Sequence, residues 1–275
     1  MKKRRTQNAK RQGAEQFMVT RDKVSAIAVC TLAAVMTAGG ARSVPTAGSS
    51  HISGNIADYL VRNLKDFSCT LHVLHYNDAA GRKINKDFGS IYKLKGNILL
   101  RYKEQNMLRL DAHLGPARAS LVVNGATQYV KIPAVGIRTV SNLGDSPGKR
   151  KTLLDVGLLS PAYLTIAQAQ FLGVRPVYGV PCACFNLQYH ASFGDTSHRL
   201  VWIDPRTHVV VKREEYSQKG KINAIYYYRD PIQAAPGIWF PTRIEAVNNE
   251  GEEAGETAYT NIKVNVGLPD SLFKL

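Results

Sequence analysis

Turn residues recur about every ten positions along residues 68–265, and they separate runs rich in β-branched and aromatic residues. The clearest case is 117–132, where Asn124-Gly125 lies between two such runs, and Asn-Gly is a strong signal for a two-residue hairpin turn. Short strands at this spacing, without helices alternating between them, are typical of an antiparallel meander. We therefore expect one mainly β (α+β) domain built on a single antiparallel sheet.

Alternation and turn signals predict where the strands of this sheet lie. We expect strands at 68–76, at three places within 88–112, in the hairpin 117–132, and at 175–189, 198–204, 208–216, 222–229, 238–247 and 257–265. In the run 208–216 the first residues are apolar and the last ones read KREE. That charged end is expected to reach solvent.

Two segments depart from the β pattern. Ser53 can cap an N-terminal amphipathic helix, and the insertion 133–173 has helical features, with Ser160-Pro161 as a start and Gly173 as a stop. The apolar stripe of the first helix would consist of Ile56, Tyr59, Leu60, Leu64 and Phe67. A leucine-rich insertion must cover something, and the open face of the sheet is the surface left for it.

Residues 1–41 have the organisation of a secretory signal peptide. A basic stretch, 1–23, precedes an uncharged apolar run, and small residues at 39–41 indicate cleavage near Ala41. An uncleaved membrane anchor is the alternative interpretation. We expect residues 42–50 to form a flexible tether, residues 51–275 to form the domain, and the protein to be periplasmic or otherwise extracytoplasmic.

The chain is basic, with 36 Lys and Arg against 21 Asp and Glu and a formal net charge of +15. The leader accounts for +6, so +9 belongs to the mature part, where the basic residues are scattered. A nucleic-acid partner would require a denser basic face, so we expect none. Attraction to an anionic membrane surface is the milder inference from this charge.

The cysteines and one histidine-containing loop are the candidates for redox, metal or catalytic chemistry. In an oxidising compartment Cys69 is expected to form a disulfide with Cys182 or Cys184, and the latter two share one face of a strand. These residues do not make a metal site, and no cofactor motif is present in the sequence. The loop with His190, Asp195 and His198 is the alternative hydrolase site, although it has no Gly-x-Ser-x-Gly turn.

The C-terminal third resembles a known family. "VWIDPRTHVVVKREEY", "GKINAIYYY", "GIWFPTRIEAVNNEG" and "ETAYTNIKVNVGLPDSLFKL" are similar, in order and spacing, to the end of outer-membrane lipoprotein-sorting (LolA-like, RseB-like) proteins. The resemblance implies a curved half-barrel whose concave face holds acyl chains beneath covering helices. In this family ligand release depends on an arginine in an early strand, and Arg101 in "LKGNILLRYKEQNMLRL" is the closest candidate here.

The resemblance implies an exported, non-catalytic carrier or sensor whose partners are lipid or lipoprotein acyl chains, the membrane surface or envelope proteins. Taking the apolar parity of each strand as inward predicts the lining of its cavity: Phe88, Tyr92, Leu94, Ile98, Leu100, Leu108, Leu110, Phe240, Ile244, Ile262 and Val264. The insertion would supply a lid of Leu153, Leu154, Leu158, Leu159 and Leu164. A structural domain with a filled core is the other alternative.

Overall fold

The computed structural model of the chain describes residues 52–274, apart from 87, 91 and 93. The signal peptide, 1–41, and the tether, 42–50, were predicted for residues that lie outside this range. Within the described residues no helix is long and apolar enough to cross a membrane.

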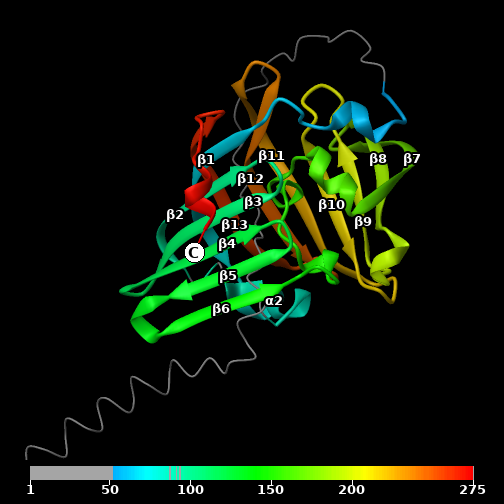
Figure 1. Cartoon of the computed structure of the whole chain (residues 1–275). Coiled ribbons are helices and arrows are strands. Elements are labelled where there is room, and N and C mark those ends of the chain that lie inside the picture. Colours follow the sequence, from blue (N-terminus) through cyan, green and yellow to red (C-terminus); the bar gives the residue numbers. More distant parts are fainter. Residues whose placement is uncertain (1–51, 87, 91, 93, 275) are drawn as a thin grey trace, which may run out of the picture.

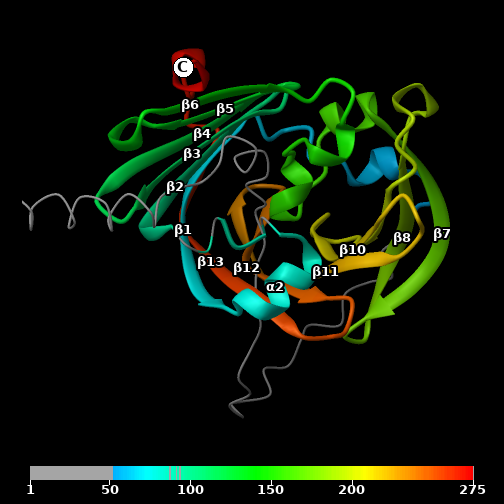
Figure 2. The ribbon, with the colours of Figure 1, turned by 90° about the horizontal axis from the view of Figure 1, so that it is seen from below.

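One antiparallel sheet of thirteen strands dominates the molecule, in the order β6-β5-β4-β3-β2-β1-β13-β12-β11-β10-β9-β8-β7. The sheet curves strongly and stays open between its edge strands β6 and β7 (Figures 1 and 2). The strands are β1 (Asp66–Tyr76), β2 (Lys95–Lys103), β3 (Met107–Leu114), β4 (Ala117–Asn124), β5 (Thr127–Ile132), β6 (Ile137–Asn142), β7 (Ala167–Val177), β8 (Val180–Tyr189), β9 (His198–Ile203), β10 (Val210–Tyr216), β11 (Ile222–Ala235), β12 (Ile238–Asn248) and β13 (Glu253–Val264). The predicted half-barrel of one curved antiparallel sheet is confirmed.

The chain builds this sheet as two meanders that meet in the middle. Strands β1 to β6 form one arm and β7 to β13 the other, and β1 pairs antiparallel with β13. Segment 143–166 connects the two edge strands, and it lies inside the curve of the sheet rather than around it (Figure 2). The insertion is therefore a connection between the two open edges.

The hydrophobic core fills the concave, inner face of the sheet. Alternate residues of each strand point inward, as Leu100 and Tyr102 do on β2, and both are nearly fully buried. Helix α2 (Asp78–Ile84) and segment 153–166 pack against the same cluster. Sequence reasoning missed α2, which Asn77 caps by accepting a hydrogen bond from the Ala80 backbone.

The expected N-terminal helix is reduced to one 3-10 turn, Ile56–Tyr59. Asn55, and not Ser53, is its cap, and Phe67 at the end of the apolar stripe belongs to β1, opposite Tyr102 on β2. Sheet pairing replaces the helix because Phe67 stacks on Tyr102 in the core. The stripe does mark burial, but its backbone is a 3-10 turn at 56–59, irregular at 60–65 and strand from Asp66 onward.

The inserted helices are also short. They are 3-10 turns at Leu153–Val156 and Pro161–Thr165, with Ser160 and Pro161 at the predicted start. Gly173 does not stop a helix, because it lies within β7 at an irregularity of the β7–β8 pairing. The single strand expected at 175–189 is divided between β7 and β8 by a turn whose residues 178 and 179 both have positive φ. The first of the three strands expected within 88–112 was wrong, because residues 88–90 form a 3-10 turn and the described residues between that turn and Lys95, where β2 begins, contain no strand.

Candidate ligand-binding interior

The predicted lining residues lie together in one cluster on the inner face. Eight of the eleven are buried: Phe88, Tyr92, Ile98, Leu100, Leu108, Leu110, Phe240 and Ile244. Leu94, Ile262 and Val264 are partly buried and pack against the same cluster. The parity argument therefore placed these side chains on the correct face of the sheet, although they come from strands that are far apart in the chain.

Residues 153–164, which we call the lid, cover this cluster. Leu153, Leu154, Leu158 and Leu159 are each at most 1% exposed, and Leu164 is partly buried against the core. These leucines occupy the space between the two arms of the sheet, where the predicted acyl chain would lie. The lid is thus an apolar plug seated on the inner face.

Two backbone hydrogen bonds hold the lid, one from the segment before β1 and one from β10. The Val61 amide donates to the Leu159 carbonyl at 2.8 Å, and the Val210 amide donates to the Gly157 carbonyl at 2.9 Å. Gly157 has φ of +82°, and an added Cβ would meet the Tyr228 ring at 2.6 Å. Only glycine permits this close approach of the lid to the sheet.

A buried ionic cluster adds side-chain contacts beneath the lid. The Arg213 guanidinium on β10 is 2% exposed, donates to the Leu154 carbonyl at 3.1 Å, and lies 3.4 Å from carboxylate oxygens of Asp155 and of Glu215. Its guanidinium also stacks 4.2 Å above the ring of Tyr226. One arginine therefore connects the polar backbone of the lid to the sheet.

Arg199 on β9 completes this cluster. It donates to Glu215 at 3.2 Å and to Tyr163 of the lid at 3.0 Å, and it also contacts the Tyr189 hydroxyl. Burial alone would raise the pKa of the Glu215 carboxyl, but Arg213 and Arg199 lower that pKa to about 2. The Glu215 carboxylate is therefore ionised throughout the physiological pH range.

The sequence prediction for this part of β10 was wrong. The KREE end of the strand was expected to reach solvent, but alternation sends Arg213 toward the inner face. A period-2 reading assigns Arg213 and Glu215 to one face and Lys212 and Glu214 to the other. The signal was present in the sequence, but the partner Asp155 comes from a segment 58 residues away.

Arg101, the predicted release arginine, lies on the opposite, outer face of the sheet. It donates to Asp111 at 2.7 Å, and Arg109 and Ser120 donate to the same carboxylate. Its neighbour Leu100 points inward, so the pleat directs Arg101 outward. The arginine that contacts the lid from the inner face is Arg213.

The predicted disulfide is not formed. Cys69 belongs to the core cluster on β1, whereas Cys182 and Cys184 lie on β8 in a separate cluster with Trp202. Five strands separate β1 from β8, and a disulfide requires Cα atoms within roughly 7 Å. The expected shared face of Cys182 and Cys184 is confirmed, and it is the outer face of the sheet. All three thiols are free and buried.

The residues of the alternative hydrolase site have separate partners. His190 contacts the backbone carbonyl of residue 164 at 3.3 Å, and Asp195 accepts two hydrogen bonds from Ser197. The His198 ring stacks on Tyr216 with centroids 4.6 Å apart. Both histidines therefore have partners other than Asp195 and Ser197, which is the geometry of a connection between β8 and β9 and not of a Ser-His-Asp triad.

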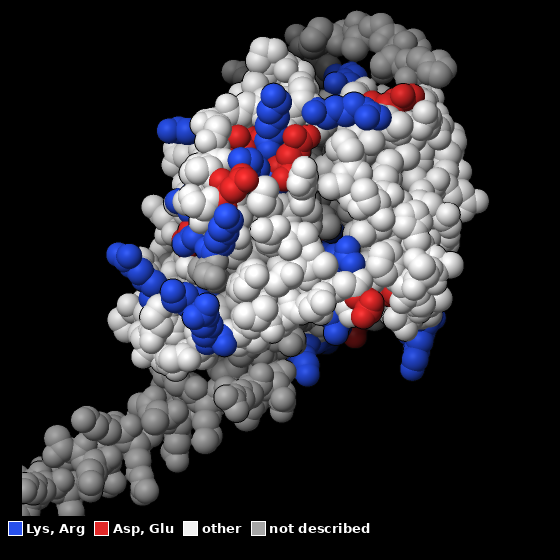
Figure 3. Space-filling view, viewed as in Figure 1, with Lys and Arg blue, Asp and Glu red and all other residues white. Residues whose placement is uncertain are grey.

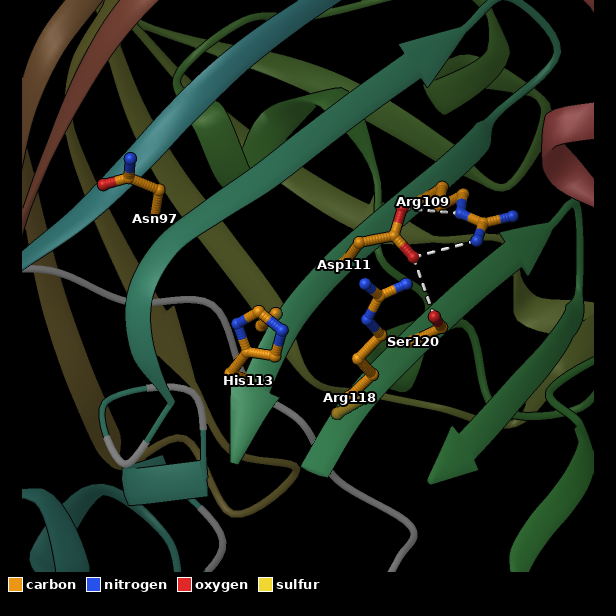
Figure 4. Close-up of a pocket in the computed structure, with 8 residues that line it drawn as sticks. Asn97, Arg109, Asp111, His113, Arg118 and Ser120 are labelled. Atoms are coloured by element: carbon orange, nitrogen blue, oxygen red, sulfur yellow. Dashed lines mark hydrogen bonds and ion pairs between the residues drawn. The ribbon is translucent and has the colours of Figure 1, made fainter. Parts of the chain in front are cut away.

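A polar pocket of about 380 Å³ opens on the outer face of β2, β3 and β4 (Figure 4). Partial burial opposes ionisation of Asp111 at its wall, but hydrogen bonds from Arg109 and Ser120 lower the pKa of this carboxyl. The residues that line the pocket are Asn97, Arg109, Asp111, Ala112, His113, Arg118, Ala119 and Ser120. Sequence reasoning did not identify this pocket, because it requires the register of three strands.

A widely curved open sheet with a covered inner face defines the LolA-like fold, and solved structures share it. A LolA superfamily protein from Nitrosomonas europaea has a TM-score of 0.53 at 17% identity, over 80% of this chain and 94% of that chain. A candidate outer-membrane lipoprotein-sorting domain from Vibrio parahaemolyticus has a TM-score of 0.53 at 12% identity, over 79% of this chain and 92% of that chain. The resemblance is thus confirmed at the level of the fold.

The sequence comparisons reach less of the chain. One protein-family model, described as an uncharacterized protein, matches residues 165–275. Among curated proteins, none matches the chain. The matched segment begins at the end of the lid and contains β7 to β13, which is the part of the sequence where the motifs of the resemblance lie.

Proposed function

We propose that this protein is an exported, non-catalytic carrier or sensor that binds an acyl chain of a lipid or lipoprotein inside its half-barrel. The observation that carries the proposal is the apolar inner face, covered by a separate leucine-rich lid. The fold supports it, because structures named for lipoprotein sorting and for the LolA superfamily share this architecture. The proposed ligand site consists of the predicted lining residues and the lid leucines.

Exchange of the lid leucines for an acyl chain requires only a small change in the free energy of apolar burial. An acyl chain that displaced the lid leucines would replace one set of buried aliphatic groups by another. Each buried CH₂ contributes about 0.8 kcal/mol, whether it belongs to a leucine or to a lipid. Because apolar burial is non-directional, the exchange itself costs little, and the polar anchors of the lid determine when it opens.

Arg213 is the anchor that we assign to this gating role. It contacts the lid through both a backbone carbonyl, that of Leu154, and a side chain, that of Asp155. The Tyr228 hydroxyl donates to the same Leu154 carbonyl at 3.1 Å. Loss of these contacts would free the lid and leave the strands of the sheet paired.

Co-purified lipid tests the proposal most directly. Organic extracts of the purified protein, analysed by mass spectrometry, should contain acyl lipid, and the Leu100→Asp variant should lose it because a charge enters the lining. Leu74→Asp is the matched control, since Leu74 is 48% exposed on β1. Circular dichroism of both variants distinguishes loss of lipid from loss of the fold.

If Leu100→Asp unfolds, a second variant tests whether the inner face binds an acyl chain. Deletion of residues 153–159 removes most of the lid, and the remaining sheet should bind a fluorescent fatty acid. An empty extract from the wild type, together with a lidless protein that unfolds or does not bind the probe, would favour a structural domain with a filled core.

A further inference from the structure

Charge is distributed unevenly along the first arm of the sheet. From residue 112 to residue 144 the chain contains no acidic residue, but it contains His113, Arg118, Lys131 and Arg138. All four side chains are exposed. Figure 3 shows Lys and Arg side chains grouped at the lower left, over the ends of β4, β5 and β6, with most acidic side chains elsewhere.

Strand register places these residues on one face. His113 pairs directly with Arg118, and Lys131 pairs with Arg138. Lys131 also pairs with Ser120, which donates to Asp111 on the outer face. Directly paired residues of an antiparallel sheet share a face, so the four basic side chains form a row across the outer face of β3 to β6.

The same end of the sheet carries an apolar turn. Residues 133–136, between β5 and β6, read Pro-Ala-Val-Gly, and every one of them is exposed. Val135 at its tip is 43% exposed, and Lys131 and Arg138 flank the turn. An exposed apolar tip between basic side chains suits the boundary between lipid headgroups and acyl chains.

The polar pocket lies beside this turn. His113 and Arg118 are exposed residues of its lining, while the only carboxylate among the lining residues, Asp111, is neutralised by Arg101 and Arg109. A volume of about 380 Å³ is sufficient for a small polar group. The pocket therefore presents the Arg118 guanidinium and the His113 imidazole with further hydrogen-bonding groups behind them, which is the chemistry that recognises a phosphate ester.

We propose that this end of the outer face docks the protein on a bilayer surface that contains anionic phospholipid. The Val135 turn would enter the headgroup region, Lys131 and Arg138 would contact lipid phosphates, and the pocket would accept one phosphate beside Arg118. Docking uses the face opposite the proposed acyl site. It is therefore independent of whether the interior binds a ligand.

The test uses the full chain. Because its basic leader could bind anionic vesicles by itself, contact is measured with a reporter placed at the tip of the 133–136 turn. A Val135→Trp variant is mixed with vesicles of phosphatidylcholine alone or with roughly a third of phosphatidylglycerol, with bromine-labelled acyl chains as quenchers. We expect tryptophan quenching to increase only with the anionic vesicles. The wild-type chain, with Trp202 and Trp239 alone, supplies the background from binding through the leader, and only quenching in excess of it reports contact at the tip.

Charge reversal of the flanking pair tests the electrostatic part. Each basic residue near an anionic membrane contributes about fivefold to partitioning, so Lys131→Glu with Arg138→Glu should weaken tip contact by roughly 30-fold or more. Lys219→Glu with Lys221→Glu is the matched control, because both residues are exposed in the β10–β11 connection. The control should leave quenching unchanged.

Three results would overturn the proposal. They are a reporter that vesicles do not quench, equal quenching with neutral and anionic vesicles, and equal losses in the two charge-reversed pairs. If the reversed pair unfolds, Lys131→Gln with Arg138→Gln replaces it and should weaken contact by a smaller factor. An acidic protein that binds this face while vesicles leave the reporter unquenched would also contradict membrane docking.

Discussion

Replacing Arg213 by methionine should detach the lid while the sheet stays folded. The change removes the bonds to the Leu154 carbonyl and to Asp155 and the ion pair with Glu215, but it keeps an unbranched apolar stem where the arginine methylenes lie. Breaking a buried ion pair by removing one partner costs about 3–5 kcal/mol. Glu215 keeps Arg199 at 3.2 Å, and Asp155 keeps the Thr152 backbone amide at 2.8 Å. We therefore expect the low end, about 3 kcal/mol.

Hydrogen exchange can measure that loss where it occurs. The amides of Val61 and Val210 donate to lid carbonyls, so their protection reports whether the lid is seated. A cost of about 3 kcal/mol corresponds to exchange that is roughly 150-fold faster at these two amides. Amides in the centre of β3 and β4 should keep their protection, since neither strand contacts Arg213. Arg229→Met is the control, because Arg229 pairs with Glu245 on the outer face.

Two outcomes would refute the reasoning. Uniform acceleration of exchange across the sheet would mean that Arg213 contributes to global stability and does not hold the lid in particular. Unchanged exchange at Val61 and Val210 would mean that the backbone contacts and the lid leucines are sufficient by themselves.

Three further predictions concern stability and the thiols. Gly157→Ala should lower the free energy of unfolding by about 1–3 kcal/mol more than Gly194→Ala, because both glycines have positive φ but only the first would place its Cβ 2.6 Å from the Tyr228 ring; equal urea midpoints would contradict this. Stability contributed by Glu215 is present above its ordinary pKa of 4.5 and is lost as the pH falls toward 2, so Glu215→Gln should show a shallower loss of stability in acid. Titration of the denatured, unreduced protein should find the thiols of Cys69, Cys182 and Cys184 all free; in the native protein they should react slowly at neutral pH, since burial raises the pKa of Cys182 to about 11. A count that is two thiols short would show that a disulfide is present and would contradict this prediction.

Local patterns were sufficient to predict the sheet. Alternation placed Leu100 and Ile244 inward, and the predicted hairpin of β4 and β5 is present, with its turn at Gly125-Ala126, one residue beyond the expected Asn-Gly pair. Both signals act within a few residues, and the pleat converts them directly into a face and a register. The lining of the interior followed from the same alternation, because apolar residues of every strand share one side.

Contacts between distant segments could not be predicted in the same way. The spacing of the apolar stripe up to Phe67 fits a helix, but pairing with Tyr102 on β2 provides a competing and larger burial. The ionic cluster depends on Asp155 arriving beside Arg213, and no local rule brings them together. Likewise the cysteines satisfied the composition of a disulfide, whereas the order of the strands separates them.

The pairing of the first strand with the last has a consequence for folding kinetics. Contacts between β1 and β13 join residues that are almost two hundred positions apart, as in the hydrogen bond between His72 and Thr260, at a separation of 188. Hairpins within each arm close early because their loops are short, but the two arms cannot join until the final strand has been synthesised. During synthesis β1 therefore presents one unpaired edge for nearly the whole time. An unpaired strand edge can associate with other chains. We therefore expect aggregation in the period between synthesis of β1 and synthesis of β13, and not from the folded protein.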